Sequence, residues 1–372
     1  MTATPSVDTR GAIGFLRTPT EGIAPLRWEG ARWTVEGAPL PEPDALRTWA
    51  GLSVEWPSAK EAEEFGEAGR RAAVDGLLAL ACAGVPLTAE PAADVPPWVP
   101  ADLGRLLADR AWPAVPRELG PRCVADLRRE EHSVRLRRLA PRPSLTPTVS
   151  VVMSSMRPHL LGSALDQIAR QRHVQVEVLL GLHGIEDHPL ARRAVEACAV
   201  PIRVVSAGAD VPFGALLNRA ASHASGDYLA KWDDDDWYGP DHLADLLLAK
   251  RASGADIVGT AAEFFYLEPL RTTIRRTSYR SETWSDFVAG GTILLDRDGF
   301  PGFEPLTRGV DAALLKARHA DGARIYRTHG LGYVLRRSLS EGHTWQLPLS
   351  HFLKVAHNQW RGFRPSLLME ST

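Results

Sequence analysis

The sequence predicts an α/β protein in which a parallel sheet has helices on both faces, preceded by a smaller, mostly helical domain. Two observations support this prediction. After Pro147, short apolar runs alternate with amphipathic segments, the order that joins parallel strands through crossover helices. Before Pro147, the chain is rich in Trp and Pro and contains long helix-forming stretches. The length of 372 residues fits two domains.

Composition narrows the functional classes. The formal net charge is -2, so the chain as a whole gives no sign of binding nucleic acid. Its three cysteines lie far apart without metal-binding spacing, which favours a reducing compartment. Residues 1–19 lack the pattern of a signal peptide, and the most hydrophobic run, residues 72–87, is too short to cross a bilayer. We expect a cytoplasmic protein, with peripheral contact at the inner face of the cell membrane left open.

The chain is expected to divide at a proline-rich linker. An accessory N-terminal domain over residues 1–140 begins with a short hairpin at "LRWEGARWTVEG" and continues with helices. The linker covers residues 141–148, where three prolines in "LAPRPSLTPT" prevent regular structure. The α/β domain follows over residues 149–346. Residues 347–372 are expected to form an amphipathic helix and a tail.

Each element of the α/β domain has its own signal. β-Branched residues mark the first strand, "TVSVVM", and Pro158 opens the helix that follows it. Further strands are expected at residues 176–182, 202–206 and 227–232, with helices at residues 190–199 and 214–226 between them. The last strand runs into four aspartates. A helix, "YGPDHLADLLLAKRASG", comes next and ends at Gly254.

The acidic stretch "KWDDDDW" is placed by this assignment at the carboxyl end of a strand. In open parallel sheets, ligands bind beyond this edge. Carboxylate oxygens are hard donors that suit Mg²⁺ or Mn²⁺ rather than Zn²⁺. Regular structure on both sides of the loop favours a divalent-cation site over the alternative, a solvated surface turn.

An ordered series of motifs resembles a known family. "SVVMSSMRPHLLGSALDQIARQ", "GALLNRAASHASGDYLAKWDDDDWYGPDHL", "VAGGTILLDRDGF" and "RGVDAALLKARHADG" are together similar to family 2 glycosyltransferases, which adopt the GT-A fold. The resemblance implies a mixed, mainly parallel nucleotide-binding sheet over residues 149–346. It further implies inverting transfer of a sugar from a nucleoside diphosphate donor, commonly a UDP-sugar, to a hydroxyl acceptor in cell-surface polysaccharide, wall glycan or glycoconjugate synthesis.

The resemblance also assigns roles to single residues. Asp233 and Asp235 match the Asp-X-Asp metal motif that holds Mn²⁺ or Mg²⁺, with Asp234 between them, and Asp311 matches the general base. The open alternative for Asp311 is a helix cap. His343 is the expected third metal ligand and His329 its weaker competitor. The nucleotide-sugar-binding candidates are Arg157, Asn218, Lys231, Asp233, Asp234, Gly290 and Gly291. Lys231 is either a phosphate contact or a plain strand residue.

One departure and several alternatives stay open. The family's acidic pair after its second strand is replaced here by "LLGLHGIED", which weakens the assignment of the base. The alternative functions are a nucleotidyltransferase acting on sugar phosphates and a non-catalytic sugar-nucleotide-binding protein. The expected partners are the donor and a glycan, lipid-linked or small-molecule acceptor, with a homodimer left open.

Overall fold

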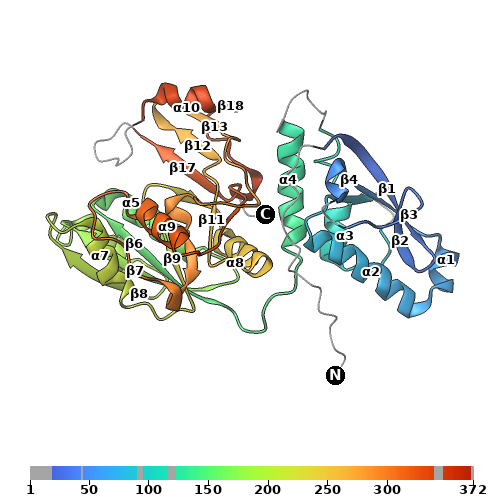
Figure 1. The fold of residues 1–372 in the computed structure, drawn as a ribbon, viewed down its shortest axis with the longest axis horizontal. Coiled ribbons are helices and arrows are strands. Elements are labelled where there is room, and N and C mark those ends of the chain that lie inside the picture. The colour runs from blue at the N-terminus through green and yellow to red at the C-terminus, as the bar shows by residue number, and fades with distance from the viewer. Residues whose placement is uncertain (1–18, 43–44, 90–94, 116–122, 339–346, 370–372) are drawn as a thin grey trace. The chain divides into compact units, whose positions relative to one another are not determined.

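The structure, a computed structural model, describes residues 19–42, 45–89, 95–115, 123–338 and 347–369. The chain forms two compact units, residues 1–142 and residues 143–372. Each unit has its own sheets and helices (Figure 1). Among the described residues, no helix combines the length and the apolar character needed to cross a membrane.

The first unit contains a five-stranded sheet in the order β3-β2-β1-β4-β5. Its strands are β1 (Glu21–Glu29), β2 (Arg32–Val35), β3 (Ala38–Pro39), β4 (Trp49–Glu55) and β5 (Leu87–Ala89). The predicted hairpin is present as β1 and β2, with Leu26 opposite Val35. The helices are α1 (Ala59–Glu64), α2 (Gly66–Cys82), α3 (Ala101–Leu107) and α4 (Val124–Arg137).

This sheet is larger than the sequence indicates. The predicted helices are found. The expected hairpin, however, is extended into a larger sheet by β4, which pairs in parallel with β1, and by β5, which pairs in parallel with β4. Parallel pairing joins segments far apart in the chain, so it leaves no local turn signal. Helix α2 packs on the sheet through Leu77, and the Trp33 indole donates a hydrogen bond to the Ala73 carbonyl at 2.9 Å.

An eight-stranded sheet in the order β14-β16-β11-β15-β9-β6-β7-β8 forms the centre of the second unit. β9, β6, β7 and β8 run parallel, whereas β15 is antiparallel to both of its neighbours. The predicted mixed, mainly parallel sheet is confirmed. The strands are β6 (Thr148–Ser155), β7 (Gln175–His183), β8 (Ile202–Ala207), β9 (Tyr228–Lys231), β11 (Ile257–Thr260), β14 (Thr283–Trp284), β15 (Leu294–Asp296) and β16 (Ile325–Thr328).

Helices cover this sheet. They are α5 (Pro158–Ala169), α6 (Pro189–Glu196), α7 (Phe213–Ala221), α8 (His242–Ser253) and α9 (Val310–Ala320). α7 and α9 share a core with the sheet, in which Leu217 and Leu314 pack with Val152. α8 ends at Gly254, whose φ of 63° is the left-handed conformation that glycine tolerates best. The predicted stop signal of this helix is therefore confirmed.

A second, five-stranded sheet lies beside the acidic turn, in the order β10-β17-β12-β13-β18. Its strands are β10 (Trp237–Tyr238), β12 (Phe264–Leu267), β13 (Thr272–Arg275), β17 (Tyr333–Arg337) and β18 (Asn358–Arg361). The predicted C-terminal amphipathic helix is shorter than expected: α10 covers only Leu349–Val355. The chain then forms β18, because antiparallel pairing with β13 offers residues 358–361 a partner that the helical pattern did not reveal.

Candidate functional site

The four aspartates lie in the turn that joins β9 to β10. Trp232, at the start of the turn, is 1% exposed, and its ring stacks on that of Tyr238 with centroids 3.7 Å apart. The Tyr238 hydroxyl accepts a hydrogen bond from the Asp233 backbone N–H at 3.0 Å and donates one to the Gly291 carbonyl at 2.9 Å. Packed aromatic rings therefore fix the base of the turn, as expected of a built site rather than a solvated loop.

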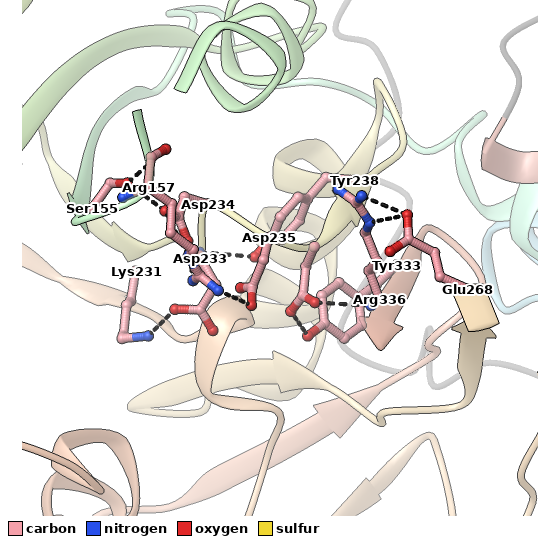
Figure 2. Close-up of polar contacts among 11 residues, drawn as sticks. Ser155, Arg157, Lys231, Asp233, Asp234, Asp235, Tyr238, Glu268, Tyr333 and Arg336 are labelled. Atoms are coloured by element: carbon pink, nitrogen blue, oxygen red, sulfur yellow. Dashed lines mark hydrogen bonds and ion pairs between the residues drawn. The ribbon is translucent and has the colours of Figure 1, made fainter. Parts of the chain in front are cut away.

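Arg157 neutralises the second and third aspartates. Its guanidinium pairs with Asp234 and, at 2.6 Å, with Asp235, as Figure 2 shows. Asp234 also accepts a hydrogen bond from the Ser155 hydroxyl at the end of β6. Burial lowers the pKa of Arg157, but the two carboxylates more than offset it and raise this pKa above its ordinary value. Arg157 therefore ties the acidic turn to the carboxyl end of β6.

Asp236 is anchored to the second sheet. Its carboxylate accepts hydrogen bonds from the Tyr333 hydroxyl and, at 3.1 Å, from the Arg336 backbone N–H. The Arg336 side chain is held by Glu268 at 2.5 Å (Figure 2). Burial, with repulsion from the neighbouring carboxylates, raises the pKa of Asp236 well above its ordinary value. Its contacts make Asp236 a support of the turn.

Lys231 joins the first aspartate to a carboxylate far along the chain. Its side chain is 1% exposed, and its Nζ lies 2.5 Å from Asp233 Oδ1 and 3.1 Å from Asp311 Oδ1. Burial lowers the pKa of Lys231, but these two carboxylates reverse the effect and raise it. Burial likewise raises the pKa of Asp311, and Lys231 opposes this shift. Lys231 is thus an ammonium ion that holds two carboxylates in place.

Two successive glycines provide the space that these carboxylates occupy. A Cβ atom on Gly290 would lie 2.4 Å from Asp311 Oδ2. On Gly291 it would lie 2.7 Å from Asp233 Oδ2 and 2.6 Å from the Tyr238 hydroxyl. Such separations are too short for any side chain, so only glycine fits at both positions.

The carboxylates face a common cavity. Its volume is about 260 Å³, and Asp233, Asp235, Asp236 and Asp311 line it together with both glycines. Residues from the turn after β9, from β17 and from the first turn of α9 thus converge on one space. The cavity brings two oxygen donors, Asp233 and Asp235, to the side of a separate carboxylate, Asp311.

This arrangement lies within a segment that matches a protein family. Residues 151–313 match the family described as glycosyl transferase family 2, and they include all four aspartates, both glycines and Asp311. The chain carries a family 2 glycosyltransferase domain. No curated protein sequence matches the chain.

Solved structures similar to the glycosyltransferase domain were also found. One is the mannosyltransferase PcManGT from Pyrobaculum calidifontis in complex with GDP-Man and Mn²⁺, with 19% identity over 54% of this chain and 60% of that chain, at a TM-score of 0.43. Another is S. aureus TarS 1-349 in complex with UDP-GlcNAc, with 16% identity over 56% of this chain and 64% of that chain, at a TM-score of 0.43. The chain thus spans less than two thirds of each of these structures.

The glycosyltransferase domain has donor atoms that fit a hard cation. Asp233 and Asp235 both bring carboxylate oxygens to the cavity. However, in the described part of the chain, no group of three or more His, Cys, Asp or Glu side chains is arranged to hold a metal ion. The predicted third ligand, His343, lies outside the described residues. An ion held by Asp233 and Asp235 would complete its coordination with further oxygens, such as those of a donor diphosphate or of water.

Side-chain cations, rather than a metal ion, stabilise the acidic turn in this structure. Lys231 pairs with Asp233, and Arg157 pairs with Asp234 and Asp235, so the protein's own cations already offset the repulsion. The crowding of aspartates alone therefore does not demonstrate a metal site. What favours one is the exposure of two of these carboxylates to the cavity.

Two other predicted residues lie elsewhere in the domain. Asn218, on α7, uses both ends of its amide on the backbone of Phe303, each at 2.7 Å, and it does not line the cavity. His329 is 3% exposed and its Nε2 lies 3.4 Å from Asp245, so it is buried beneath α8 rather than turned toward the cavity. The structure gives both residues structural contacts.

Sequence reasoning missed one wall of the cavity. Arg276, Tyr279 and Phe287 line it, and all three belong to the segment between β13 and Gly290. The arginine-rich text "RTTIRRTSYR" was the available signal. It carries no spacing that points to a site, because loop residues meet a cavity only through the tertiary fold.

Proposed function

We propose that this protein is an inverting glycosyltransferase that moves a sugar from a nucleoside diphosphate donor to a hydroxyl acceptor with the help of Mn²⁺ or Mg²⁺. The observation that carries the proposal is the cavity itself. It is lined by the two acids of an Asp-X-Asp pair and, separately, by Asp311 at the start of α9. Asp233 and Asp235 provide donor binding, and Asp311 provides the general base.

The chemistry needs one proton acceptor and one place for the leaving diphosphate. Asp311 takes the proton from the acceptor hydroxyl as its oxygen bonds to the anomeric carbon. The bond from that carbon to the donor diphosphate breaks on the opposite side, and the sugar is inverted. A cation held by Asp233 and Asp235 would neutralise the charge on the departing diphosphate. Asp311 must be ionised to act, and Lys231 favours that form.

Arg157 and Lys231 act mainly by positioning. Arg157 fixes Asp235, the expected direct metal ligand, through the 2.6 Å pair. Lys231 fixes Asp233 and Asp311 relative to each other. Because it is 1% exposed, Lys231 holds the carboxylates rather than reaching into the cavity toward a phosphate. The glycine pair leaves both acids in contact with substrate.

The donor is proposed to be a UDP-sugar, because that is the common donor of the family the motifs resemble. The proposed role is in cell-surface polysaccharide, wall glycan or glycoconjugate synthesis, on the cytoplasmic side of the cell membrane. Nucleotide identity is the first property to measure.

Thermal unfolding with a panel of nucleoside diphosphates, with and without Mn²⁺, tests the proposal. A ligand that binds only the folded protein adds about 2.7 kcal/mol to its stability at a hundredfold excess over Kd. We expect one nucleotide to raise the unfolding temperature only with the metal, and Asp235→Ala to lose this effect. If no nucleotide gives a shift, the proposal fails. Nucleotide binding without sugar transfer to any acceptor would instead indicate a sugar-nucleotide-binding protein.

A further inference from the structure

The cavity wall formed by Arg276, Tyr279 and Phe287 carries the positive charge of Arg276. Arg276 follows β13, and its guanidinium lies over the ring of Tyr279, 4.1 Å from the ring centroid. Its Nε donates a hydrogen bond to the Ser278 hydroxyl at 2.6 Å. Both contacts orient the guanidinium without neutralising it, since neither partner is an anion.

Arg276 differs in this from Arg336, and in its greater exposure from Arg337, the other two arginines that line the cavity. Arg336 pairs with Glu268 at 2.5 Å. Arg337 donates to the Leu347 carbonyl at 3.3 Å and is 7% exposed. Among the described residues, Arg276 forms no ion pair with a carboxylate. Arg276 therefore combines a charge that no described carboxylate pairs with and a side chain that a ligand in the cavity can reach.

Two aromatic rings continue the wall. Tyr279 and Phe287 lie with their centroids 6.0 Å apart and their planes inclined at 38°. Phe287 is 38% exposed although it is a large apolar residue. The Arg327 guanidinium holds the backbone of residues 280–287 by donating hydrogen bonds to the carbonyls of Arg280 at 2.6 Å and Phe287 at 3.1 Å. These contacts fix the positions of the Tyr279 and Phe287 rings. The exposed part of Phe287 can therefore pack against an apolar surface such as a sugar ring.

The Phe287 end of this wall continues along the chain to the proposed base. Phe287 lies in the segment that ends at Gly290, and Gly290 contacts Asp311. A group bound beside Phe287 shares the cavity with the proposed base, Asp311. The diphosphate of the donor belongs with Asp233 and Asp235, where the cation would hold it.

We propose that the acceptor carries an anionic group, a carboxylate or a phosphate ester, which binds Arg276 while a ring of the acceptor packs on Phe287. This inference rests on the proposed function and adds to it the chemical class of the acceptor. Hydrogen bonds from a guanidinium to an anion are stronger than those between neutral groups, and a guanidinium matches the planar geometry of carboxylate and phosphate. Arg276 is then a specificity-determining residue.

Binding of matched sugars to the full-length protein tests the proposal. Glucuronate and glucose 6-phosphate represent the two anions, and methyl glucoside is the neutral match. Their affinities are measured by ligand-detected NMR with the donor subsite filled by the nucleotide and Mn²⁺ that stabilise the protein, or without them if none does. We expect one or both anionic sugars to bind roughly tenfold more tightly than the neutral one. The stronger of the two identifies the anion.

Three variants locate the effect. Arg276→Met keeps the aliphatic stem and is expected to abolish the preference, whereas Arg276→Lys keeps the charge and should retain part of it. Arg280→Met removes an exposed charge from the same loop outside the cavity lining and should leave the preference unchanged. Equal affinity for all three sugars, absence of binding, or a preference that survives in Arg276→Met would each overturn the inference.

Failure of the inference is distinguishable from failure of the proposed function. Nucleotide binding is measured on the same wild-type and Arg276→Met samples. Nucleotide binding without any anionic preference overturns the inference alone. No nucleotide binding overturns the proposed function, whatever the sugars show.

Discussion

Lys231 Nζ lies 3.1 Å from Asp311 Oδ1, although Lys231 ends β9 and Asp311 belongs to the first turn of α9. The same Nζ lies 2.5 Å from Asp233, so one buried cation sets the spacing between Asp233 and Asp311. Burying an ammonium ion is costly unless it is paired, and two carboxylates supply that pairing.

Lys231→Met should leave two carboxylates without their shared cation and let them move apart. A displacement of about 1 Å at a reacting group can cost on the order of 100-fold in rate. We therefore expect sugar transfer to fall by about that factor, measured as kcat with saturating donor. The unfolding transition of the same variant is the control. A variant that stays folded and keeps wild-type kcat would contradict the positioning role.

Asp311→Asn should abolish proton removal while preserving the shape of the side chain. General base catalysis contributes roughly 100- to 10,000-fold, so transfer should fall within that range. Donor binding, measured by nucleotide-induced thermal stabilisation, should stay close to wild type. Gly309, not Asp311, is the N-cap of α9, so normal turnover in this variant would instead limit Asp311 to its ion pair with Lys231.

Gly290→Ala and Gly291→Ala should separate the two halves of the site. The new methyl group at Gly290 would meet Asp311 Oδ2 at 2.4 Å and should lower kcat with little change in donor affinity. At Gly291 it would meet Asp233 Oδ2 at 2.7 Å and should weaken donor binding. Gly299→Ala is the matched control, because nothing lies within 4 Å of its Cβ position. If Gly290→Ala and Gly299→Ala changed kcat equally, crowding against Asp311 would not be the cause.

Tyr333→Phe should destabilise the protein by leaving Asp236 without one of its hydrogen bonds. Asp236 is 6% exposed and would retain only the Arg336 backbone donor among the contacts described above. Leaving a buried polar group without its hydrogen-bond partner costs about 1–3 kcal/mol. Urea unfolding measures this cost, and Tyr228→Phe, a half-buried tyrosine on β9, is the comparison. Equal stability in both variants would show that Asp236 does not depend on Tyr333.

His242 should make the protein sensitive to mild acid. Burial, with a contribution from His329, lowers the pKa of His242 to about 3, despite the opposing charge of Asp245. Its pKa in the unfolded chain is about 6.5, so below that pH the unfolded state binds the proton and the folded state does not. The free energy of unfolding should therefore decrease as the pH falls from 6.5 toward 3, with about 2 kcal/mol lost by pH 5 from this group.

His242→Phe removes the proton site and keeps a ring that can pack against Trp232 and Tyr238. Urea unfolding at pH 7 and at pH 5 should show a smaller loss of stability in this variant than in the wild type. The same loss in both proteins would mean that His242 is protonated when folded or that other groups dominate the acid response.

Local signals in the sequence were sufficient for four strands of the central sheet, β6, β7, β8 and β9. "TVSVVM" and "DYLAKW" combine β-branched or apolar residues with turn signals at their ends, and both are strands. Gly254 ended its helix as predicted. The order of these elements identified the fold class, because short alternating strands and helices have few other ways to bury their apolar faces.

Long-range pairing was not accessible in the same way. β4 and β5 extend the N-terminal sheet by pairing in parallel, and β18 turns the end of the C-terminal segment into a strand on β13. In each case a partner far along the chain decided the conformation. A short segment has little conformational preference of its own, so the hydrogen bonds offered by a neighbouring strand outweigh it.

By itself, the sequence determined that four aspartates follow a strand and that their motifs are those of a family 2 glycosyltransferase. Tertiary structure alone decided which charges meet. It placed Lys231 between Asp233 and Asp311, Arg157 on Asp234 and Asp235, and Asp236 against Tyr333. It also brought Arg276 to the same cavity. The physical reason is that electrostatic contacts depend on distance in space, which a chain acquires only when its sheets and helices pack.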